Sequence, residues 1–162
     1  MRPRPANPED AEAITRIYNQ GIEERIATFE TRPRSIEEVR TRLEEPHPTI
    51  VVEDEGGIVS FAWTSSYSDR GCYSGVADFS VYVDRGSRNR GAGRAAMEAL
   101  IGAAEEAGFW KLTSKVFVEN IPSRKLLASL GFREVGVHEK HARLDGKWRD
   151  VMVVERLIPP NL

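Results

Sequence analysis

The chain has a single cysteine, Cys72, so it cannot form a disulfide within itself. This scarcity excludes a small secreted scaffold held together by several disulfides. No stretch approaches the run of about 18 apolar residues that a membrane-spanning helix requires, so we expect no membrane partner. The first residues also lack the apolar segment of a signal peptide. We therefore expect a protein of the reducing cytoplasm.

An excess of charge of one sign is also missing. The 23 basic and 25 acidic side chains leave a formal net charge of −2. This balance excludes an overall basic nucleic-acid binder, although it leaves room for a local basic patch. The 162 residues are 40% hydrophobic, which is too apolar for a disordered chain and sufficient for an ordinary core. We expect one domain over residues 1–162.

Apolar spacing and turn residues predict four helices and six strands. The helices are expected to begin at Asn7 and Ser35, which suit N-caps, and to cover residues 91–107 and 122–130. The strands are expected at residues 49–53, 58–66, 76–83, 111–118, 132–141 and 150–157. This order of elements predicts a mixed α/β (α+β) fold in which helices flank a sheet.

The most informative segment leads from the strand ending at Val83, through an arginine- and glycine-rich loop, into the helix that starts at Gly91. A helix start presents free N–H groups and a partial positive charge, and both suit an anion. Gly91 and Gly93 have no side chains that would keep a phosphate away from the backbone. Guanidinium groups suit contacts to phosphate oxygens. The segment carries four of them within ten residues: Arg85, Arg88, Arg90 and Arg94.

Other phosphate motifs do not match this segment. A P-loop needs Gly, four residues and then Gly-Lys-Ser/Thr, and the dinucleotide motif needs G-x-G-x-x-G. The order here is Arg88-x-x-Gly91-x-Gly93. Taken alone, this string fits an exposed arginine-rich turn before a capped helix equally well. We expect no nucleic-acid partner, because no aromatic stacking residues are interleaved with the arginines.

Two motifs together resemble the GCN5-related N-acetyltransferase (GNAT) superfamily. Arg88-x-x-Gly91-x-Gly93 after a strand resembles the superfamily's pyrophosphate loop, and the segment from Asn120-Ile121-Pro122-Ser123 to Gly131-Phe132 resembles its next motif. The resemblance implies the GNAT fold, with a twisted, mixed and mostly antiparallel sheet flanked by helices. It also implies acetyl-CoA as cosubstrate. The implied contacts are Val81, Val83, Arg88, Asn89, Arg90, Gly91, Ala92, Gly93, Arg94, Asn120 and Ser123.

Further segments resemble the phosphinothricin and arsinothricin N-acetyltransferase branch. They are Thr28–Thr31, Cys72-Tyr73, Ser80–Val83 and Asp145–Val151. The branch transfers acetyl to the amine of a small amino acid or analogue, such as phosphinothricin, arsinothricin or methionine sulfoximine. Its members are commonly homodimers, so the resemblance implies a homodimer here.

Acetyl transfer from a thioester to an amine requires a base for the amine proton, donors for the developing oxyanion and departure of the thiolate. Asp78 is the candidate base, at a position where relatives usually carry Glu; a solvated strand residue or a dimer contact is the alternative. The resemblance places the Val81 N–H at the thioester carbonyl. Many relatives carry Tyr or His at the position of Leu127, which cannot donate a proton. Tyr82 or solvent remains as the acid.

For the acceptor, Arg70 matches an arginine that holds the substrate carboxylate in this branch, while the neighbouring basic position is Ser68. Phe29, Glu30 and Tyr73 are the other candidate acceptor contacts, although aromatic residues at such positions often pack in a core or an interface.

We expect no metal site. His138 and His141 are three residues apart on an expected strand, so they should point to opposite faces and not share an ion. Two other functions remain open at this stage. One is a GNAT acyltransferase that acts on protein or polyamine amines, and the other is a non-catalytic CoA-binding protein, as Leu127 and the short Asp78 side chain would allow.

Overall fold

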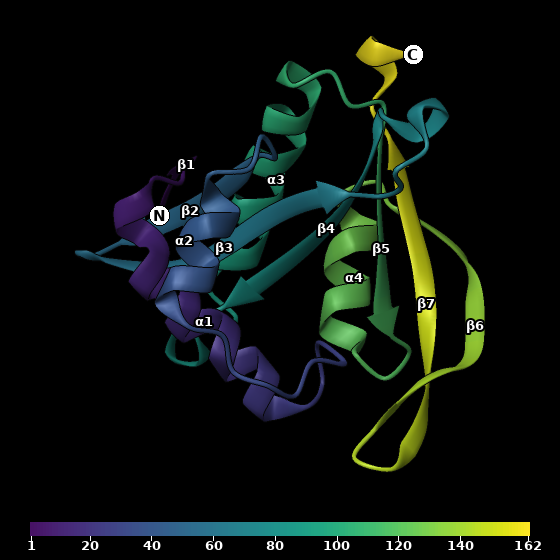
Figure 1. Cartoon of the computed structure of the whole chain (residues 1–162), viewed down its shortest axis with the longest axis horizontal. Helices are drawn as coiled ribbons and strands as arrows, with labels where there is room; N and C mark the ends of the chain where they lie inside the picture. Colours follow the sequence, from purple (N-terminus) through teal and green to yellow (C-terminus); the bar gives the residue numbers. More distant parts are fainter.

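Seven strands form one sheet in the order β1-β2-β3-β4-β5-β7-β6 in the computed structural model, which describes all residues 1–162 (Figure 1). The strands are β1 (Arg2–Pro5), β2 (Thr49–Asp54), β3 (Gly57–Ser66), β4 (Val76–Val83), β5 (Lys111–Phe117), β6 (Arg133–Leu144) and β7 (Lys147–Leu157). The helices are α1 (Ala11–Glu24), α2 (Ile36–Leu43), α3 (Ala92–Glu106) and α4 (Ile121–Ser129). Only β4 and β5 pair in parallel; all other neighbours are antiparallel.

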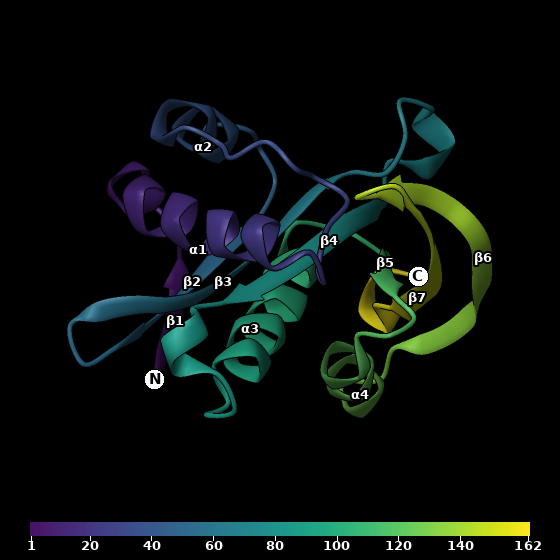
Figure 2. The same cartoon turned by 90° about the horizontal axis from the view of Figure 1, so that it is seen from below.

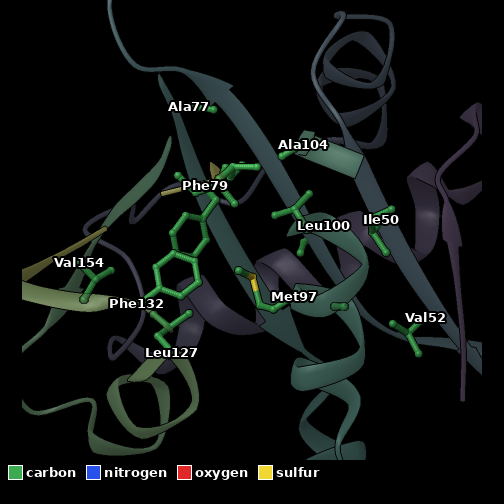
Figure 3. Packing of buried hydrophobic residues seen from close by; sticks show 14 of the residues in the cluster. Ile50, Val52, Ala77, Phe79, Met97, Leu100, Ala104, Leu127, Phe132 and Val154 are labelled. Atoms are coloured by element: carbon green, nitrogen blue, oxygen red, sulfur yellow. The ribbon is translucent and has the colours of Figure 1, made fainter. Parts of the chain in front are cut away.

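The helices cover both faces of the sheet. Figure 2 shows α1 and α2 on one face and α3 and α4 on the other. Each face has its own apolar core, because side chains alternate between the faces along a strand. The larger cluster lies under α3 and α4 and includes Phe79, Leu100 and Leu127 (Figure 3). The second lies under α1 and includes Phe61 and Trp63. No helix has the length and apolarity needed to cross a bilayer.

Local capping signals explain the helix starts that the sequence predicted. The Ser35 hydroxyl accepts the Glu38 N–H at 3.1 Å, and the Glu38 carboxylate accepts the Ser35 N–H at 3.4 Å, which completes a capping box at α2. The Asn7 side chain accepts the Glu9 N–H at 2.9 Å. Asn7 caps a 3₁₀ turn over Pro8–Asp10, and this turn leads into α1, so the regular helix begins later than predicted.

The two edges of the sheet differ from the prediction. Strand β1 was not predicted, because Pro3 and Pro5 lack N–H groups and suit only an edge strand. At the other edge, β6 and β7 are longer than expected and form a hairpin around Asp145 and Gly146, both with positive φ.

The expected orientation of the two histidines was wrong. The ring centroids of His138 and His141 are 4.7 Å apart, so the rings do not point to opposite faces. The register of β6 against β7 shifts between His138 and Ala142, and Lys140 has a φ of +47°. This irregularity breaks the alternation of side chains on which the expectation depended.

The central feature of the sheet is the divergence of β4 from β5. Their parallel pairing covers only Val76–Asp78 against Lys111–Thr113. Beyond that point the two strands separate, and the arrows of β4 and β5 point apart in Figure 1. The carboxyl-terminal half of β4 therefore has β3 on one side and no strand on the other.

Candidate active site

The divergence leaves peptide groups of β4 without strand partners. The Phe79 carbonyl accepts the Ser114 hydroxyl of β5 at 2.8 Å, whereas the Asp84 N–H donates to Val59 on the β3 side at 2.8 Å. Because peptide groups alternate in direction along a strand, the groups of Val81 and Val83 point to the side where β5 is missing. Val81 and Val83, two of the residues that the resemblance assigned to the cosubstrate, therefore present free N–H and C=O groups to the gap.

The loop after β4 positions the start of α3 beside this gap. Asp84 fixes the entry, because its carboxylate accepts the Gly86 N–H at 3.1 Å and the Arg16 guanidinium at 2.5 Å. Gly91 takes a φ of +87°, the left-handed conformation that favours glycine, and α3 begins at the next residue. A Cβ on Gly93 would lie 3.3 Å from the side chains of Val83 and Leu126. Glycine at both positions keeps the helix start open to an anion.

A cavity of about 480 Å³ lies over this helix start and along the open side of β4. Its lining includes ten of the residues predicted for the cosubstrate: Val81, Val83, Arg88, Asn89, Gly91, Ala92, Gly93, Arg94, Asn120 and Ser123. Tyr82 also lines it. Segments that are far apart in the sequence, from Ile17 to Leu126, thus converge on one cavity, which an isolated arginine-rich turn would not require.

The arginines of the loop have different partners. Arg88 makes a two-pronged ion pair with Glu24 of α1, and the hydrogen bonds from Arg88 keep the pKa of Glu24 below its ordinary value. Both side chains line the cavity. Arg90 lies outside the lining and pairs with Asp54 at 3.0 Å. Arg88 therefore has an anionic neighbour that holds its guanidinium at the cavity wall, whereas Arg90 contacts the last residue of β2.

The start of α4 forms the opposite wall. The Asn120 side chain accepts the Ser123 N–H at 3.4 Å and donates to the Ile26 carbonyl at 3.3 Å. Asn120 therefore caps α4 and also ties it to the segment after α1. The Asn-x-x-Ser spacing that the sequence highlighted has a local structural role here, and both residues still line the cavity.

A smaller cavity of about 50 Å³ continues between the diverging strands. It shares Val81, Tyr82, Asn120 and Ser123 with the larger one, and Lys115 of β5 contributes to its wall. Leu127 also lines it and is buried against Phe79 and Phe132 in the core (Figure 3). The other α4 residue in its lining is Ser123, which carries a hydroxyl and not the phenol or imidazole that many relatives have at the position of Leu127.

Asp78 lies on the face of β4 that carries Ser80 and Tyr82, because its neighbours Ala77 and Phe79 belong to the core on the α3 face. Burial raises the pKa of the Asp78 carboxyl, and the positive charge of Lys115 opposes this shift. Asp78 lines neither cavity. A carboxylate with a raised pKa is suited to accept a proton at neutral pH.

Tyr82 belongs to an aromatic cluster under α1. Its ring centroid is 5.2 Å from that of Tyr18 and 5.4 Å from that of Phe61. A Cβ on Gly21 would lie 2.9 Å from the Tyr82 ring, so glycine allows α1 to approach β4 closely. Burial raises the pKa of the Tyr82 phenol well above its ordinary value.

The four candidate acceptor residues line neither cavity. Phe29 packs edge-on against Phe117 at 4.7 Å, and Glu30 pairs with Arg34 at 2.7 Å. Arg70 and Tyr73 are exposed in the loop before β4, with the Arg70 guanidinium 5.8 Å from the Tyr73 ring centroid. This loop is at the opposite end of β4 from the phosphate loop (Figure 1).

Sequence reasoning missed several lining residues. Glu24, Ala27, Lys115 and Leu126 contribute to the cavities through tertiary contacts that bring α1, β5 and α4 to β4. Only Leu126 stood within a recognised motif. The others carried no local signal, because a lone acid, alanine or lysine is compatible with any surface position.

Comparison with known proteins agrees with this architecture. Residues 4–153 match the family described as "Acetyltransferase (GNAT) domain". The protein YwnH of Bacillus subtilis (strain 168) is 34% identical over 164 residues, which cover 96% of this chain and 98% of YwnH. The chain therefore belongs to the GNAT acetyltransferase family. It is an acetyltransferase.

Two solved structures are close in shape. The ribosomal-protein-alanine N-acetyltransferase from Brucella melitensis superimposes with a TM-score of 0.94 at 26% identity, covering 98% of this chain and 100% of that one. The GNAT superfamily phosphinothricin acetyltransferase from Sinorhizobium meliloti, in complex with AcCoA, superimposes with a TM-score of 0.90 at 27% identity, covering 96% and 87%. Both structures align with nearly the whole of this chain.

Proposed function

We propose that the protein acetylates the amine of a small amino acid or amino-acid analogue, of the kind represented by phosphinothricin, arsinothricin and methionine sulfoximine. The observation that carries the proposal is the cavity that joins the glycine loop at α3 to the free peptide groups of β4. The similarity to a phosphinothricin acetyltransferase over 96% of this chain supports the choice of acceptor.

Different residues of the cavity bind different parts of acetyl-CoA. The amides at the start of α3, together with Arg88 and Arg94, bind the pyrophosphate through charge-assisted hydrogen bonds. Val83, Asn120 and Ser123 contact the pantetheine arm. The arm leads along β4 to Val81, whose N–H points into the gap and polarises the thioester carbonyl.

Asp78 acts as the general base for the acceptor amine. It takes one proton from the ammonium, through an ordered water or directly, and the freed nitrogen lone pair attacks the thioester carbonyl carbon. The C–N bond forms as the C–S bond breaks, and the electron pair of that bond leaves with the sulfur. A second proton leaves the nitrogen to solvent.

Solvent then protonates the thiolate of CoA. Leu127 has no proton to give, and the raised pKa of Tyr82 makes its phenol a poor acid toward a thiolate whose conjugate acid has a pKa near 8.5. Tyr82 therefore has a positioning role, in which its ring packs against Tyr18 and Gly21 and holds the peptide of Val81 in place.

The acceptor approaches from the α1 face of the sheet, where Asp78 and Lys115 lie. Phe29 and Glu30 belong to the segment between α1 and α2 and cover this side. Arg70 makes no ion pair in this structure and is free to bind an anionic group of the acceptor, with Tyr73 beside it. Each protomer of a homodimer would carry one such site.

Thiol release from acetyl-CoA tests the proposal. The purified protein is incubated with acetyl-CoA, a thiol reporter and a panel that contains phosphinothricin, methionine sulfoximine and ordinary amino acids. We expect saturable, acceptor-dependent thiol release with at least one amino-acid analogue and N-acetylated product by mass spectrometry. A protein that binds acetyl-CoA but acetylates no member of the panel would overturn the proposed acceptor class.

A protein amino terminus is the second candidate acceptor, because the Brucella melitensis structure with a TM-score of 0.94 is a ribosomal-protein-alanine N-acetyltransferase. Peptides with an amino-terminal alanine and polyamines are added to the same assay. Faster turnover of the peptides than of every free amino acid would favour this alternative.

The dimer interface is proposed at the outer edge of the sheet. Strand β6 is an edge strand whose Val135 and Val137 side chains are 45% and 44% exposed, and Trp148 of β7 is 52% exposed. Exposed apolar side chains along a long edge strand are a liability in a monomer and are typical of an interface. We call Val135, Val137 and Trp148 the outer-edge patch.

A further inference from the structure

Most arginines of this chain form ion pairs with a carboxylate. The exceptions are Arg42, Arg70, Arg143 and Arg156. Arg156 still donates to two backbone carbonyls, at 2.9 and 3.1 Å. The guanidinium groups of the other three donate no hydrogen bond within the protein, and each lies over an aromatic ring.

Arg42 differs from the other two in its surroundings. Its guanidinium carbon lies 3.6 Å from the centroid of the Trp63 ring, against 5.8 Å for Arg70 over Tyr73 and 4.6 Å for Arg143 over Trp148. Arg70 and Arg143 are exposed, whereas Arg42 is half-buried between α2 and the sheet. A charged group that has lost water without gaining a partner is costly, and burial accordingly lowers the pKa of Arg42.

The strand register locates Arg42 relative to the reaction site. Trp63, which Arg42 covers, is the cross-strand partner of Ser80 on β4. Ser80 lies between Asp78 and Tyr82 on the same face of the strand. Cross-strand neighbours are about 5 Å apart, and successive same-face residues of a strand are about 7 Å apart. The distance from Trp63, across to Ser80 and along β4 to Asp78, is therefore comparable to the length of a small amino acid.

The other charged groups near Arg42 leave its donors free. Tyr18 and Tyr82 are within electrostatic reach, and both phenols keep their protons because burial raises their pKa values. Glu45 acts on Arg42 electrostatically but forms no ion pair with it. Arg34 and Lys115 add further positive charge on this side, although Arg34 is already paired with Glu30.

We infer that Arg42, stacked on Trp63, binds an oxyanion of the acceptor and so determines which amines the enzyme accepts. The stacked, planar guanidinium is preorganised and offers a pair of N–H donors to a carboxylate or phosphinate. Such a group would restore the second cation that the acceptor site lacks at Ser68. This inference rests on the proposed acetylation of amino-acid analogues.

The test compares acceptor binding by wild-type protein and by Arg42→Gln, each saturated with CoA, by calorimetry. Three acceptors are used: methionine sulfoximine, whose carboxylate is its only anion; decarboxylated phosphinothricin, whose phosphinate is its only anion; and decarboxylated methionine sulfoximine, which has no anion. We expect Arg42→Gln to weaken binding of at least one anionic acceptor about ten- to hundredfold. The amine without an anion should bind both proteins equally.

Arg143→Gln is the matched control, because Arg143 is also unpaired and stacked on a tryptophan but lies on the outer β6 strand. It should leave all three affinities unchanged, and CoA affinity should be the same in all proteins. Equal affinities for Arg42→Gln and wild type, or an equal loss for all three acceptors, would overturn the assignment of Arg42. Failure of the wild-type protein to release thiol with any amino acid would instead overturn the proposed function.

Discussion

The chemistry of the site depends on single residues whose surroundings set their protonation. Asp78 is shielded from water, so its carboxyl holds a proton more tightly than an exposed aspartate, while Lys115 acts in the opposite direction. A base of this kind is more effective at neutral pH than an ordinary aspartate. In the proposed mechanism, the pair Asp78 and Lys115 therefore controls the pH range in which the acceptor amine can be activated.

The pH dependence of kcat/KM tests this pair. The proposed mechanism requires ionised Asp78, so kcat/KM should fall as the pH drops through the Asp78 pKa. Removing the positive charge with Lys115→Met should raise that pKa further, and the acid limb of the profile should move to higher pH. Lys125→Met, which removes an exposed lysine of α4 that makes no ion pair, is the control and should leave the limb in place.

Substitution of the proposed base, Asp78, should affect the rate more strongly than substitution of Lys115. Asp78→Asn should lower kcat about 10²- to 10⁴-fold, the range for loss of a general base. Asp78→Glu should retain measurable activity because a carboxylate remains. An Asp78→Asn protein with unchanged kcat would show that the amine loses its proton elsewhere.

Among the structural elements, β4 and the loop that follows it contribute most to the proposed cosubstrate site. The strand supplies free peptide groups because β5 diverges from it, and the loop supplies the amides at the start of α3. Gly91 can take its φ of +87° at little cost, whereas a β-branched side chain at that position would be strained. The cavity therefore depends on backbone conformation as much as on side-chain charge.

The double substitution Arg88→Ala with Gly91→Val should weaken acetyl-CoA binding by well over tenfold, which corresponds to more than about 1.4 kcal/mol. It removes a guanidinium from the cavity wall and distorts the start of α3. Calorimetry with acetyl-CoA measures the loss, and thermal melting verifies that the protein is folded. Arg90→Ala is the matched control, since Arg90 pairs with Asp54 outside the cavity, and it should change the affinity less than threefold or so.

The elements differ in how far the sequence could predict them. The caps at Asn7 and Ser35 and the glycine loop depend on local hydrogen bonds and backbone angles, so their sequence signals were sufficient. Strand β1 was missed because proline is normally evidence against a strand. The His138 and His141 rings lie close together because β6 is irregular, and no residue between them predicts this irregularity from the sequence.

In the site, too, features that depend on local sequence were predictable, and features that depend on tertiary packing were not. The cavity-lining residues of β4, its loop and the start of α4 were predictable because they follow one another along the chain. The ion pair of Arg88 with Glu24 and the stacking of Arg42 on Trp63 join residues from separate elements. Such contacts depend on how the helices pack on the sheet, and nothing in the local sequence specifies them.

At the scale of the whole molecule, the two edges of the sheet are unlike. Edge β1 is short and carries two prolines, which protect it against further pairing. Edge β6 is long, exposed along most of its length and carries two of the three residues of the outer-edge patch. Association of two copies is therefore expected at β6 and not at β1.

Size-exclusion chromatography with light scattering measures this association. The wild-type protein should have twice the monomer mass of 18.2 kDa. Val137→Glu places a charge in the outer-edge patch and should shift the mass toward that of the monomer. Ile36→Glu, at an exposed apolar position of α2, is the control and should leave the mass of the dimer unchanged. A wild-type protein that is monomeric at all concentrations would contradict the proposed dimer.

A crystal structure of the protein with bound acetyl-CoA tests the central claim most directly. We expect the pyrophosphate to accept hydrogen bonds from the amides of residues 89–94, with the pantetheine arm running along the free side of β4 and the acetyl carbonyl at the Val81 N–H. A cosubstrate bound at another place, with the glycine loop making no contact to its phosphates, would contradict the account.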